Sequence, residues 1–368
     1  MQLPLSGSAV YAMKIAQVAP LFERVPPMAY GGTERVISYL TEELVRQGHE
    51  VTLFASGDSV TAARLVAPIE HSMRPDQKSH GWLAYQTIQM DQLAALADAF
   101  DVIHFHTDYL HFPLARALGV PHLTTVHGRL DLPELAPLYR HFSDTPLVSI
   151  SDNQRLPLPW ANWLQTVHHG LPPELYAYQE NEGNYFVFIG RISPEKRVDR
   201  AIDIALDCGR RLYIAAKIDD ADAGYFNDRI KPLLDHPLVE YIGEIGEREK
   251  RELLGNATAL LFPIDWPEPF GLVMIEAFAC GTPVIAYRHG SIPEIMEHGV
   301  TGFVVTDQDE AKQAARDIGT LDRRRCRDVF ERRFTASHMA GNYLAAYQRV
   351  AGGRQPSDEA PGSRYVIK

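Results

Sequence analysis

The stretch PEPFGLVMIEAFACGTPVIA, residues 267–286, decides how the rest of the chain is interpreted. An apolar strand is expected just before it, at 259–262, and a second one at its end, at 284–286. Between them, Pro267 and Pro269 bound a loop, a helix follows, and Gly281 ends that helix. A strand, a helix and a second strand joined by short connections predict a parallel sheet with helices on its faces.

The loop and the start of this helix have the chemistry of a binding site. In open α/β sheets, ligands bind beyond the carboxyl ends of the strands, which is where Glu268 stands. Residues 270–273 open the helix, so their free amides and the helix dipole suit a phosphate. Glu276 lies more than a turn further on, and a carboxylate there could bind the vicinal hydroxyls of a sugar. The alternative is a helix-capping Glu268 and a solvated Glu276, which the full string disfavours.

The same alternation extends in both directions along the chain. A linker rich in Pro, Gly and polar residues at 170–184 separates two blocks of strands and helices. Two such blocks predict an α/β protein with two doubly wound Rossmann-like domains and a cleft between them. The strands are expected at 14–19, 50–55, 102–105, 123–126 and 147–150, and then at 185–189, 212–215, 239–242, 259–262, 284–286 and 303–305.

Five segments are expected in all. Residues 1–12 are an N-terminal extension and residues 13–172 form the first domain. Residues 173–335 form the second domain. A helix at 336–351 crosses back to the first domain, and residues 352–368 are a flexible, polar tail.

The composition of the sequence disfavours several classes of protein. The 368 residues carry a formal net charge of −11, which disfavours a nucleic-acid partner. No apolar run approaches the ~20 residues of a membrane span. The three cysteines, Cys208, Cys280 and Cys326, are too few and too widely spaced for a disulfide framework or a cysteine-based zinc site. With no secretory pattern at the N-terminus, a cytoplasmic protein is expected.

Two further strings have the composition of phosphate-binding loops. Gly190 is expected to end the strand at 185–189 in a close turn, with Arg191 and Lys196 just beyond it. Two cations there would stabilise a leaving diphosphate, although isolated surface charges are the alternative. Gly31 and Gly32 precede a helix and would allow close approach of a ligand, although a flexible loop is the alternative. No G-x-G-x-x-G dinucleotide fingerprint occurs in the sequence.

Histidines follow two strands of the first block. His127 and Gly128 end the strand at 123–126, where cleft residues are expected, although a structural histidine is the alternative. His106 is expected on the acceptor side of the cleft rather than as a metal ligand. The D-x-D strings at 220–222 and 307–309 are interpreted as acids in first helical turns, so no metal site is expected.

These motifs together resemble the retaining glycosyltransferases of family 4, which have the GT-B fold. The resemblance extends from Met13 to about Val350. The string AYGGTERV at 29–36 resembles a branch of the family that includes an avilamycin-pathway enzyme. The resemblance implies that Glu268 contacts hydroxyls of a donor sugar and that Glu276 holds the nucleotide ribose. The amides of Phe270, Gly271 and Leu272 would line the sugar and the diphosphate.

The resemblance assigns the remaining site residues as well. Arg191 and Lys196 match the diphosphate-binding pair, and His127 lies by the hydroxyls of the donor sugar. Gly128 stands where many relatives have Asp. The implied catalytic set is His127, Glu268, Arg191 and Lys196. The implied donor-binding set adds Gly31, Gly32, Gly190, Tyr241, Ile242, Gly243, Phe270, Gly271, Leu272 and Glu276, and the acceptor side has His106 and Gly128.

The expected activity is therefore transfer of a hexosyl group from a nucleoside-diphosphate sugar to an acceptor hydroxyl, with retained configuration. A UDP-sugar is the first expectation for the donor, and no other cofactor or metal is expected. The acceptor is expected to be a soluble glycan or a small molecule. Membrane association is not favoured by the acidic balance of the first domain. The alternatives are a nucleotide-sugar 2-epimerase of the same fold and a non-catalytic nucleotide-sugar-binding subunit.

Overall fold

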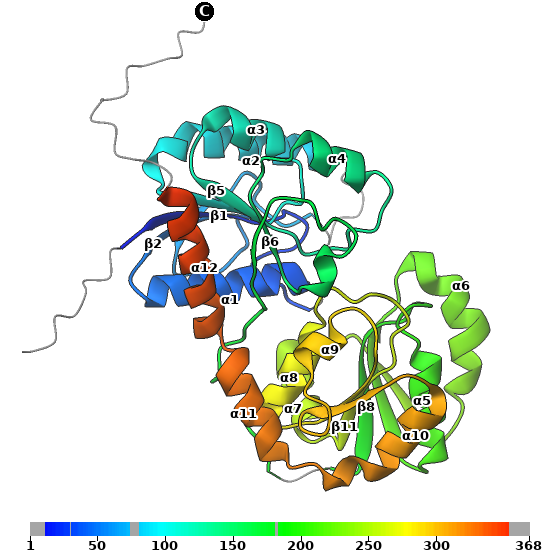
Figure 1. Cartoon of the computed structure of the whole chain (residues 1–368). Coiled ribbons are helices and arrows are strands. Elements are labelled where there is room, and N and C mark those ends of the chain that lie inside the picture. The colour runs from blue at the N-terminus through cyan, green and yellow to red at the C-terminus, as the bar shows by residue number, and fades with distance from the viewer. Residues whose placement is uncertain (1–11, 30, 74–80, 181–182, 353–368) are drawn as a thin grey trace, which may run out of the picture.

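The computed structural model describes residues 12–29, 31–73, 81–180 and 183–352. It has two α/β units stacked end to end, with the N-terminal unit at the top of Figure 1 and the C-terminal unit below it. Most of the expected N-terminal extension and all of the expected tail after residue 352 lie outside the described residues, as does Tyr30 of the glycine-rich string.

The N-terminal unit contains a seven-stranded parallel sheet in the order β3-β2-β1-β4-β5-β6-β7. Its strands are β1 (Lys14–Val18), β2 (Glu50–Phe54), β3 (Arg64–Val66), β4 (Val102–Phe105), β5 (His122–Thr125), β6 (Leu147–Ser149) and β7 (Trp163–Thr166). The sequence did not predict β3 or β7. β3 has only three residues, and β7 is an edge strand whose residues are all half-buried, so neither has a pattern of alternating burial.

The C-terminal unit contains a six-stranded parallel sheet in the order β10-β9-β8-β11-β12-β13. Its strands are β8 (Tyr185–Arg191), β9 (Arg211–Lys217), β10 (Val239–Gly243), β11 (Ala259–Phe262), β12 (Val284–Tyr287) and β13 (Gly302–Val305). One expectation was wrong: Gly190 does not end the strand in a turn. It pairs with Ala216, and Arg191 pairs with Lys217, because β8 and β9 continue side by side to those residues.

Helices connect the strands of both sheets. The N-terminal unit has α1 (Gly32–Arg46), α2 (Trp82–Leu96), α3 (Phe112–Leu118) and α4 (Leu135–His141). The C-terminal unit has α5 (Val198–Asp207), α6 (Ala223–Tyr225), α7 (Glu247–Gly255), α8 (Leu272–Cys280), α9 (Ile292–Ile295), α10 (Gln308–Asp317) and α11 (Arg323–Arg333). The last helix, α12 (Ala336–Ala351), leaves α11 and packs against α1 and β5 of the N-terminal unit (Figure 1).

Each sheet reverses its winding direction once. In the N-terminal sheet the reversal lies between β1 and β4, and in the C-terminal sheet between β8 and β11. The crossovers on the two sides of such a point run in opposite directions, which leaves a crevice at the carboxyl ends of the strands. The two doubly wound Rossmann-like domains expected from the sequence are confirmed, and each contributes one crevice.

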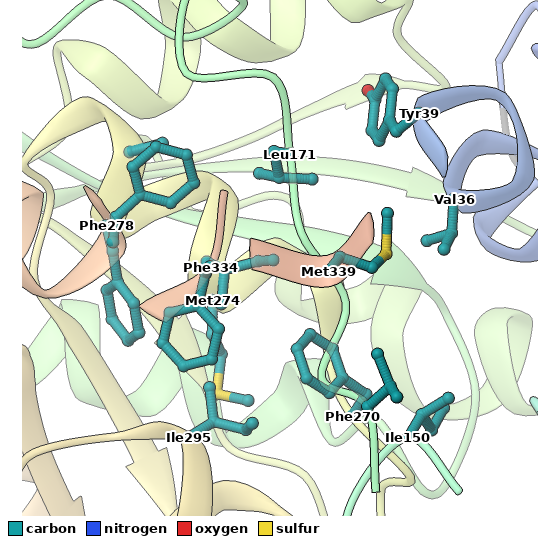
Figure 2. Close-up of a cluster of buried hydrophobic side chains, with 14 of the residues drawn as sticks. Val36, Tyr39, Ile150, Leu171, Phe270, Met274, Phe278, Ile295, Phe334 and Met339 are labelled. Atoms are coloured by element: carbon teal, nitrogen blue, oxygen red, sulfur yellow. The ribbon is translucent and has the colours of Figure 1, made fainter. Parts of the chain in front are cut away.

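One apolar core extends through both units. Val36 and Tyr39 of α1 belong to the same buried cluster as Phe270, Met274 and Phe278 at and in α8. Figure 2 shows this cluster around Phe334, in the segment that joins α11 to α12, and Met339 in the first turn of α12. Burial of this much apolar surface stabilises the association of the two units and fixes the space between them.

Candidate functional site

A cavity of about 760 Å³ lies between the two units at the carboxyl ends of both sheets. The residues that line it come from both units, so neither unit forms it alone. Thirteen of the site residues expected from the sequence line this cavity: Gly31, Gly32, His106, His127, Gly128, Gly190, Arg191, Lys196, Glu268, Phe270, Gly271, Leu272 and Glu276.

Three expected donor-binding residues do not line the cavity. Tyr241, Ile242 and Gly243 belong to strand β10, and the hydroxyl of Tyr241 donates to the carbonyl of Ala216, 2.9 Å away. The cavity wall is instead formed by residues 244–247, because the residues of β10, which ends at Gly243, lie within the sheet and those after it turn toward α7. The expectation of cavity contact was therefore three residues too early.

Glu268 and Lys196 form an ion pair in the cavity wall, and each side chain is only 13% exposed. The indole Nε1 of Trp266 donates to the same carboxylate at 3.0 Å, and the Lys196 ammonium lies 5.0 Å from the Trp266 ring centre. Ser291 holds the loop from behind, because its amide donates to the carbonyl of Glu268 and its hydroxyl to that of Phe270. Glu268 is thus a preorganised carboxylate beside a cation.

The first turn of α8 opens toward the cavity and toward the glycine loop of the other unit. Gly271, its N-cap, has φ +80°, and a Cβ there would lie 2.8 Å from the Met274 side chain. A Cβ on Gly32 would lie 3.4 Å from Leu272. The free amides and the positive end of the α8 dipole therefore point into the cavity at a place where Gly32 of the other unit lies against Leu272.

A second charged cluster surrounds Glu276 and crosses between the units. The Lys250 ammonium lies 2.6 Å from Glu276 and 3.2 Å from Glu247. Glu247 also forms an ion pair with Arg35 of α1 and accepts from the Tyr176 hydroxyl. Burial alone would raise the pKa of Glu247, but Lys250 and Arg35 outweigh it and lower that pKa. Sequence reasoning identified Glu276 and missed its partners.

The remaining cations of this wall also have carboxylate partners. Arg191 contacts Glu195 at 3.0 Å and Asp219 at 3.4 Å. Lys217 contacts Asp219 at 2.8 Å. Both cations line the cavity near Lys196. The C-terminal wall therefore presents several positive groups that are already oriented by neighbouring carboxylates.

Histidines line the N-terminal wall. His127 Nε2 lies 2.9 Å from His106 Nδ1, and the ring of His169 stacks on His127 with 5.5 Å between centres. Burial lowers the pKa of His127 to about 4 and holds the pKa values of His106 and His169 well below 6.5. All three rings are therefore neutral at pH 7. His169 was missed, because it follows no motif and comes close only through folding.

Aromatic side chains and one carboxylate surround the N-terminal rim of the cavity. Phe22, Trp82 and Tyr109 are each between 41% and 45% exposed, and the rings of Phe22 and Trp82 are 6.3 Å apart. Asp108, between β4 and α3, has φ 48°, a conformation that non-glycine residues rarely adopt. Such strain is typical of binding sites.

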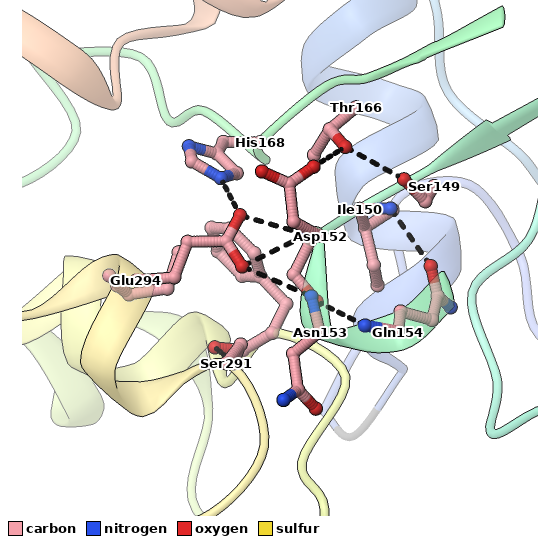
Figure 3. A network of polar contacts seen from close by, with 12 residues as sticks. Ser149, Ile150, Asp152, Asn153, Gln154, Thr166, His168, Ser291 and Glu294 are labelled. Atoms are coloured by element: carbon pink, nitrogen blue, oxygen red, sulfur yellow. Dashed lines mark hydrogen bonds and ion pairs between the residues drawn. The ribbon is translucent and has the colours of Figure 1, made fainter. Parts of the chain in front are cut away.

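A polar contact outside the cavity fixes the two units relative to each other. Glu294 of α9 accepts from the amide of Asp152 at 2.9 Å and from the amide of Asn153 at 3.3 Å (Figure 3). The same carboxylate lies 2.6 Å from His168 Nε2. Because these groups come from three separated segments, the contact holds the residues after β6, the residue His168 after β7 and helix α9 together.

Neither D-x-D string has the geometry of a metal site. Asp307 caps α10 by accepting from the Glu310 amide at 2.9 Å, as its first-turn position predicts. Asp222 lies 3.9 Å from Arg191, which already provides a positive partner. Within the described ranges, no three His, Cys, Asp or Glu side chains are grouped closely enough to hold a metal ion. None of the helices in those ranges is long and apolar enough to cross a membrane.

Comparison with known proteins defines the class of this two-domain fold. Residues 30–176 match the model described as Glycosyltransferase Family 4, and residues 177–325 match the one described as Glycosyl transferases group 1. The glycogen synthase of Mycobacterium tuberculosis is 26% identical over 91% of this chain and 95% of its own length.

Solved structures agree with this fold. AviGT4, a glycosyltransferase involved in avilamycin A biosynthesis, superposes with a TM-score of 0.71 at 24% identity, over 93% of this chain and 99% of its own. Anabaena HepE in complex with UDP and glucose superposes with a TM-score of 0.70 at 18% identity, over 92% of this chain and all of its own.

The fold and the interdomain cavity are thus those of a GT-B glycosyltransferase. Since the two family models together span residues 30–325 without a gap, the chain belongs to the group 1 glycosyltransferases with a family 4 N-terminal domain. The resemblance to glycosyltransferases of group 1 and family 4 with the GT-B fold is confirmed, and AviGT4 of the avilamycin pathway is among the structures that share this fold.

Proposed function

We propose that this protein transfers a hexosyl group from a nucleoside-diphosphate sugar, with UDP as the first candidate nucleotide, to an acceptor hydroxyl with retention of configuration. The observation that carries the proposal is the Lys196–Glu268 pair beside the open first turn of α8, inside a cavity formed by both domains. A cation and free amides suit a diphosphate, and a carboxylate suits sugar hydroxyls. UDP is favoured because the structurally similar HepE has been solved with UDP-glucose.

In this proposal the C-terminal domain holds the donor. Glu276 binds the ribose diol, and Lys250 orients its carboxylate at 2.6 Å. Residues 244–246 lie at the end of the cavity where the base would fit. Arg191 and Lys196 exchange part of their interaction with carboxylates for the two phosphates. Preorganised cations cost no reorganisation when the leaving group becomes more negative.

The chemical step follows from this placement. The acceptor oxygen forms a bond to the anomeric carbon on the face that the diphosphate leaves. The bond between that carbon and the phosphate oxygen breaks, and the departing phosphate takes the acceptor proton. Arg191, Lys196 and the amides of α8 stabilise the charge that develops on the leaving group. Resident metal is not needed in this scheme, because these groups supply the positive charge.

The N-terminal domain then binds the acceptor. His106 and Gly128 line that side of the cavity, and the aromatic rim of Phe22, Trp82 and Tyr109 suits the apolar face of a sugar ring or of another small molecule. We therefore propose a soluble glycan or a small hydroxylated molecule as acceptor.

The test is a product assay with UDP-, GDP-, ADP- and dTDP-hexoses and a panel of glycosides and hydroxylated aromatic compounds. The expected result is acceptor-dependent release of one nucleoside diphosphate and a new glycoside of retained configuration by NMR. Conversion of donor without acceptor into a product inverted at C2, whether still linked to the nucleotide or released as free sugar, would instead identify an epimerase. Donor binding without turnover across the panel would contradict the proposed transfer.

A further inference from the structure

A chain of buried hydrogen bonds leads from the cavity to helix α12. His127 Nε2 lies 2.9 Å from His106 Nδ1, and His106 Nε2 lies 2.8 Å from the side-chain oxygen of Gln17 in β1. The amide nitrogen of Gln17 donates to the hydroxyl of Tyr347 in α12 at 2.9 Å. Gln17 and Tyr347 are completely buried, and His106 is 2% exposed. Water therefore has no access with which to replace the two hydrogen bonds of Gln17.

Gln17 determines which atom donates and which accepts in each hydrogen bond of this series. A carbonyl oxygen only accepts, so His106 must carry a proton on Nε2. A neutral imidazole carries one proton, and burial keeps the pKa of His106 well below 6.5. His106 Nδ1 therefore accepts, and the proton between the two rings belongs to His127 Nε2. The remaining nitrogen of His127, Nδ1, is left as a bare acceptor.

Tyr347 accepts the hydrogen bond from the Gln17 amide nitrogen in this orientation. Its hydroxyl lies 2.8 Å from His104 Nδ1 as well as 2.9 Å from the Gln17 nitrogen. Because the hydroxyl accepts from Gln17, its own proton goes to His104. His104 Nε2 then donates to the Thr125 hydroxyl at 2.7 Å. In this arrangement each hydrogen bond from Gln17 through Tyr347 and His104 to Thr125 has one donor and one acceptor, and the Gln17 oxygen faces His106.

His127 Nδ1, the nitrogen left without a proton, is the atom of this hydrogen-bond series that faces the cavity. His127 lines the cavity, and its Nδ1 is buried without a hydrogen-bond partner among the described residues. A buried polar atom without a partner lowers stability, so native proteins rarely keep one unless a ligand satisfies it. An unprotonated nitrogen can be satisfied only by a group that donates.

We infer that Gln17 and Tyr347 are positioning residues which, through His106, hold His127 in the tautomer that offers an unprotonated Nδ1 to a hydroxyl of the bound substrate. Neither residue touches the cavity. The selectivity follows from the acceptor character of Nδ1: a substrate hydroxyl can donate to it, whereas a fluorine or methoxy group at the same position cannot. That the hydroxyl belongs to a sugar rests on the proposed function, but the tautomer does not.

The tautomer can be measured directly by NMR on protein labelled with ¹⁵N at histidine, at pH 7 and without substrate. Long-range ¹H–¹⁵N correlations distinguish a protonated Nε2 from a protonated Nδ1, and His127→Gln assigns the signal. The expected spectrum shows His127 protonated at Nε2. A His127 protonated at Nδ1 would overturn the inference, because it requires the opposite order along the whole chain.

Four variants test whether Gln17 and Tyr347 impose that state. Gln17→Met removes both polar groups at similar length and is expected to give a mixture of His127 tautomers. Gln17→Glu should keep His127 protonated at Nε2, because a carboxylate only accepts from His106, while Tyr347 then donates to the carboxylate and the His104 signals change. Tyr347→Phe retains the ring, frees the Gln17 amide to turn, and is the second test if Gln17→Met fails to fold. Tyr343→Phe, a buried tyrosine of the same helix that contacts Thr125, should leave the spectrum unchanged.

Wild-type tautomers in both Gln17→Met and Tyr347→Phe would overturn the positioning role. Where turnover is measurable, Gln17→Met should lower kcat/KM roughly 3- to 10-fold, the scale of one neutral hydrogen bond. Gln17→Glu should restore it. The kcat/KM measurement depends on the proposed function, whereas the NMR measurement of the tautomer does not. Failure of the proposed function and failure of the positioning role can therefore be told apart.

Discussion

The two walls of the cavity hold their polar groups in opposite ways. The C-terminal wall carries Lys196, Lys250 and other cations, each matched by a carboxylate within the wall. The N-terminal wall carries three histidines that burial keeps uncharged, His106, His127 and His169, and its Arg35 pairs with Glu247 of the opposite wall. Charges need partners when they are removed from water, whereas a neutral ring needs only hydrogen bonds. The comparison indicates that one wall is built to stabilise charge and the other to orient hydroxyls.

The largest effect should come from breaking the charged wall at its centre. Lys196→Ala and Glu268→Ala should each lower turnover at least ~100-fold, the scale of losing one transition-state charge contact. Steady-state kinetics check this, with Lys312→Ala as a control, since Lys312 pairs with Asp203 on the surface of the same domain. Near-normal rates in both variants would show that this pair is not the centre of the site.

A smaller effect is expected at the second charged cluster. Glu276→Gln removes the charge that pairs with Lys250 and weakens the hydrogen bonds to a ribose diol. The KM for the donor should therefore rise about tenfold, with a smaller change in kcat. Glu252→Gln, an exposed glutamate on the neighbouring helix α7, is the matched control. An effect on kcat alone would contradict a role in ground-state donor binding.

The buried, uncharged histidines of the N-terminal domain should make the free energy of unfolding depend on pH. The pKa of His127 is lowered to about 4, and burial also lowers those of His104, His106, His111 and His169. Their folded-state pKa values lie below the unfolded value of about 6.5, so the unfolded chain binds more protons between these values. Stability is then complete above pH 6.5 and is lost as the pH falls toward 4.

Urea unfolding at pH 7.0 and pH 5.5 measures this loss, which should amount to about 1 kcal/mol for each buried histidine. His104→Gln should reduce the loss by about one such increment. A free energy of unfolding that is the same at both pH values would mean that these rings are protonated in the folded protein.

The smallest effect is expected from chelation. Since cations and amides of the C-terminal wall supply the positive charge in the proposed scheme, EDTA should leave the rate unchanged. The assay compares enzyme dialysed against EDTA with enzyme supplied with Mg²⁺ or Mn²⁺. Loss of activity that Mn²⁺ alone restores would assign a role to a metal and change the interpretation of this wall.

The parts of the site that could be predicted from sequence are those that lie close together along the chain. Glu268, the α8 amides and Glu276 belong to one loop and one helix, so their spacing alone predicts a common face. All six strands of the C-terminal sheet were predicted, because each is a short apolar run between turn residues. Such local patterns survive in any tertiary context.

The groups that could not be predicted depend on distant segments. Arg35 meets Glu247 only because α1 and α7 face each other across the cavity, and Gln17 meets Tyr347 from opposite ends of the chain. Neither pair has a spacing that distinguishes it from ordinary surface or core residues. The error at Tyr241 has a local cause: the end of β10 was predicted to within one residue, but the residues that line the cavity follow the strand rather than belong to it.

The central claim is that the charged wall binds a nucleoside diphosphate, and thermal unfolding with UDP, GDP, ADP and dTDP tests it most directly. At 100 times its Kd, a ligand adds about 2.7 kcal/mol, which should raise Tm by about 5–10 °C. The account predicts such a rise for one diphosphate, UDP first, and its loss in Lys196→Ala. An unchanged Tm with all four diphosphates, or an equal rise in Lys196→Ala, would contradict it.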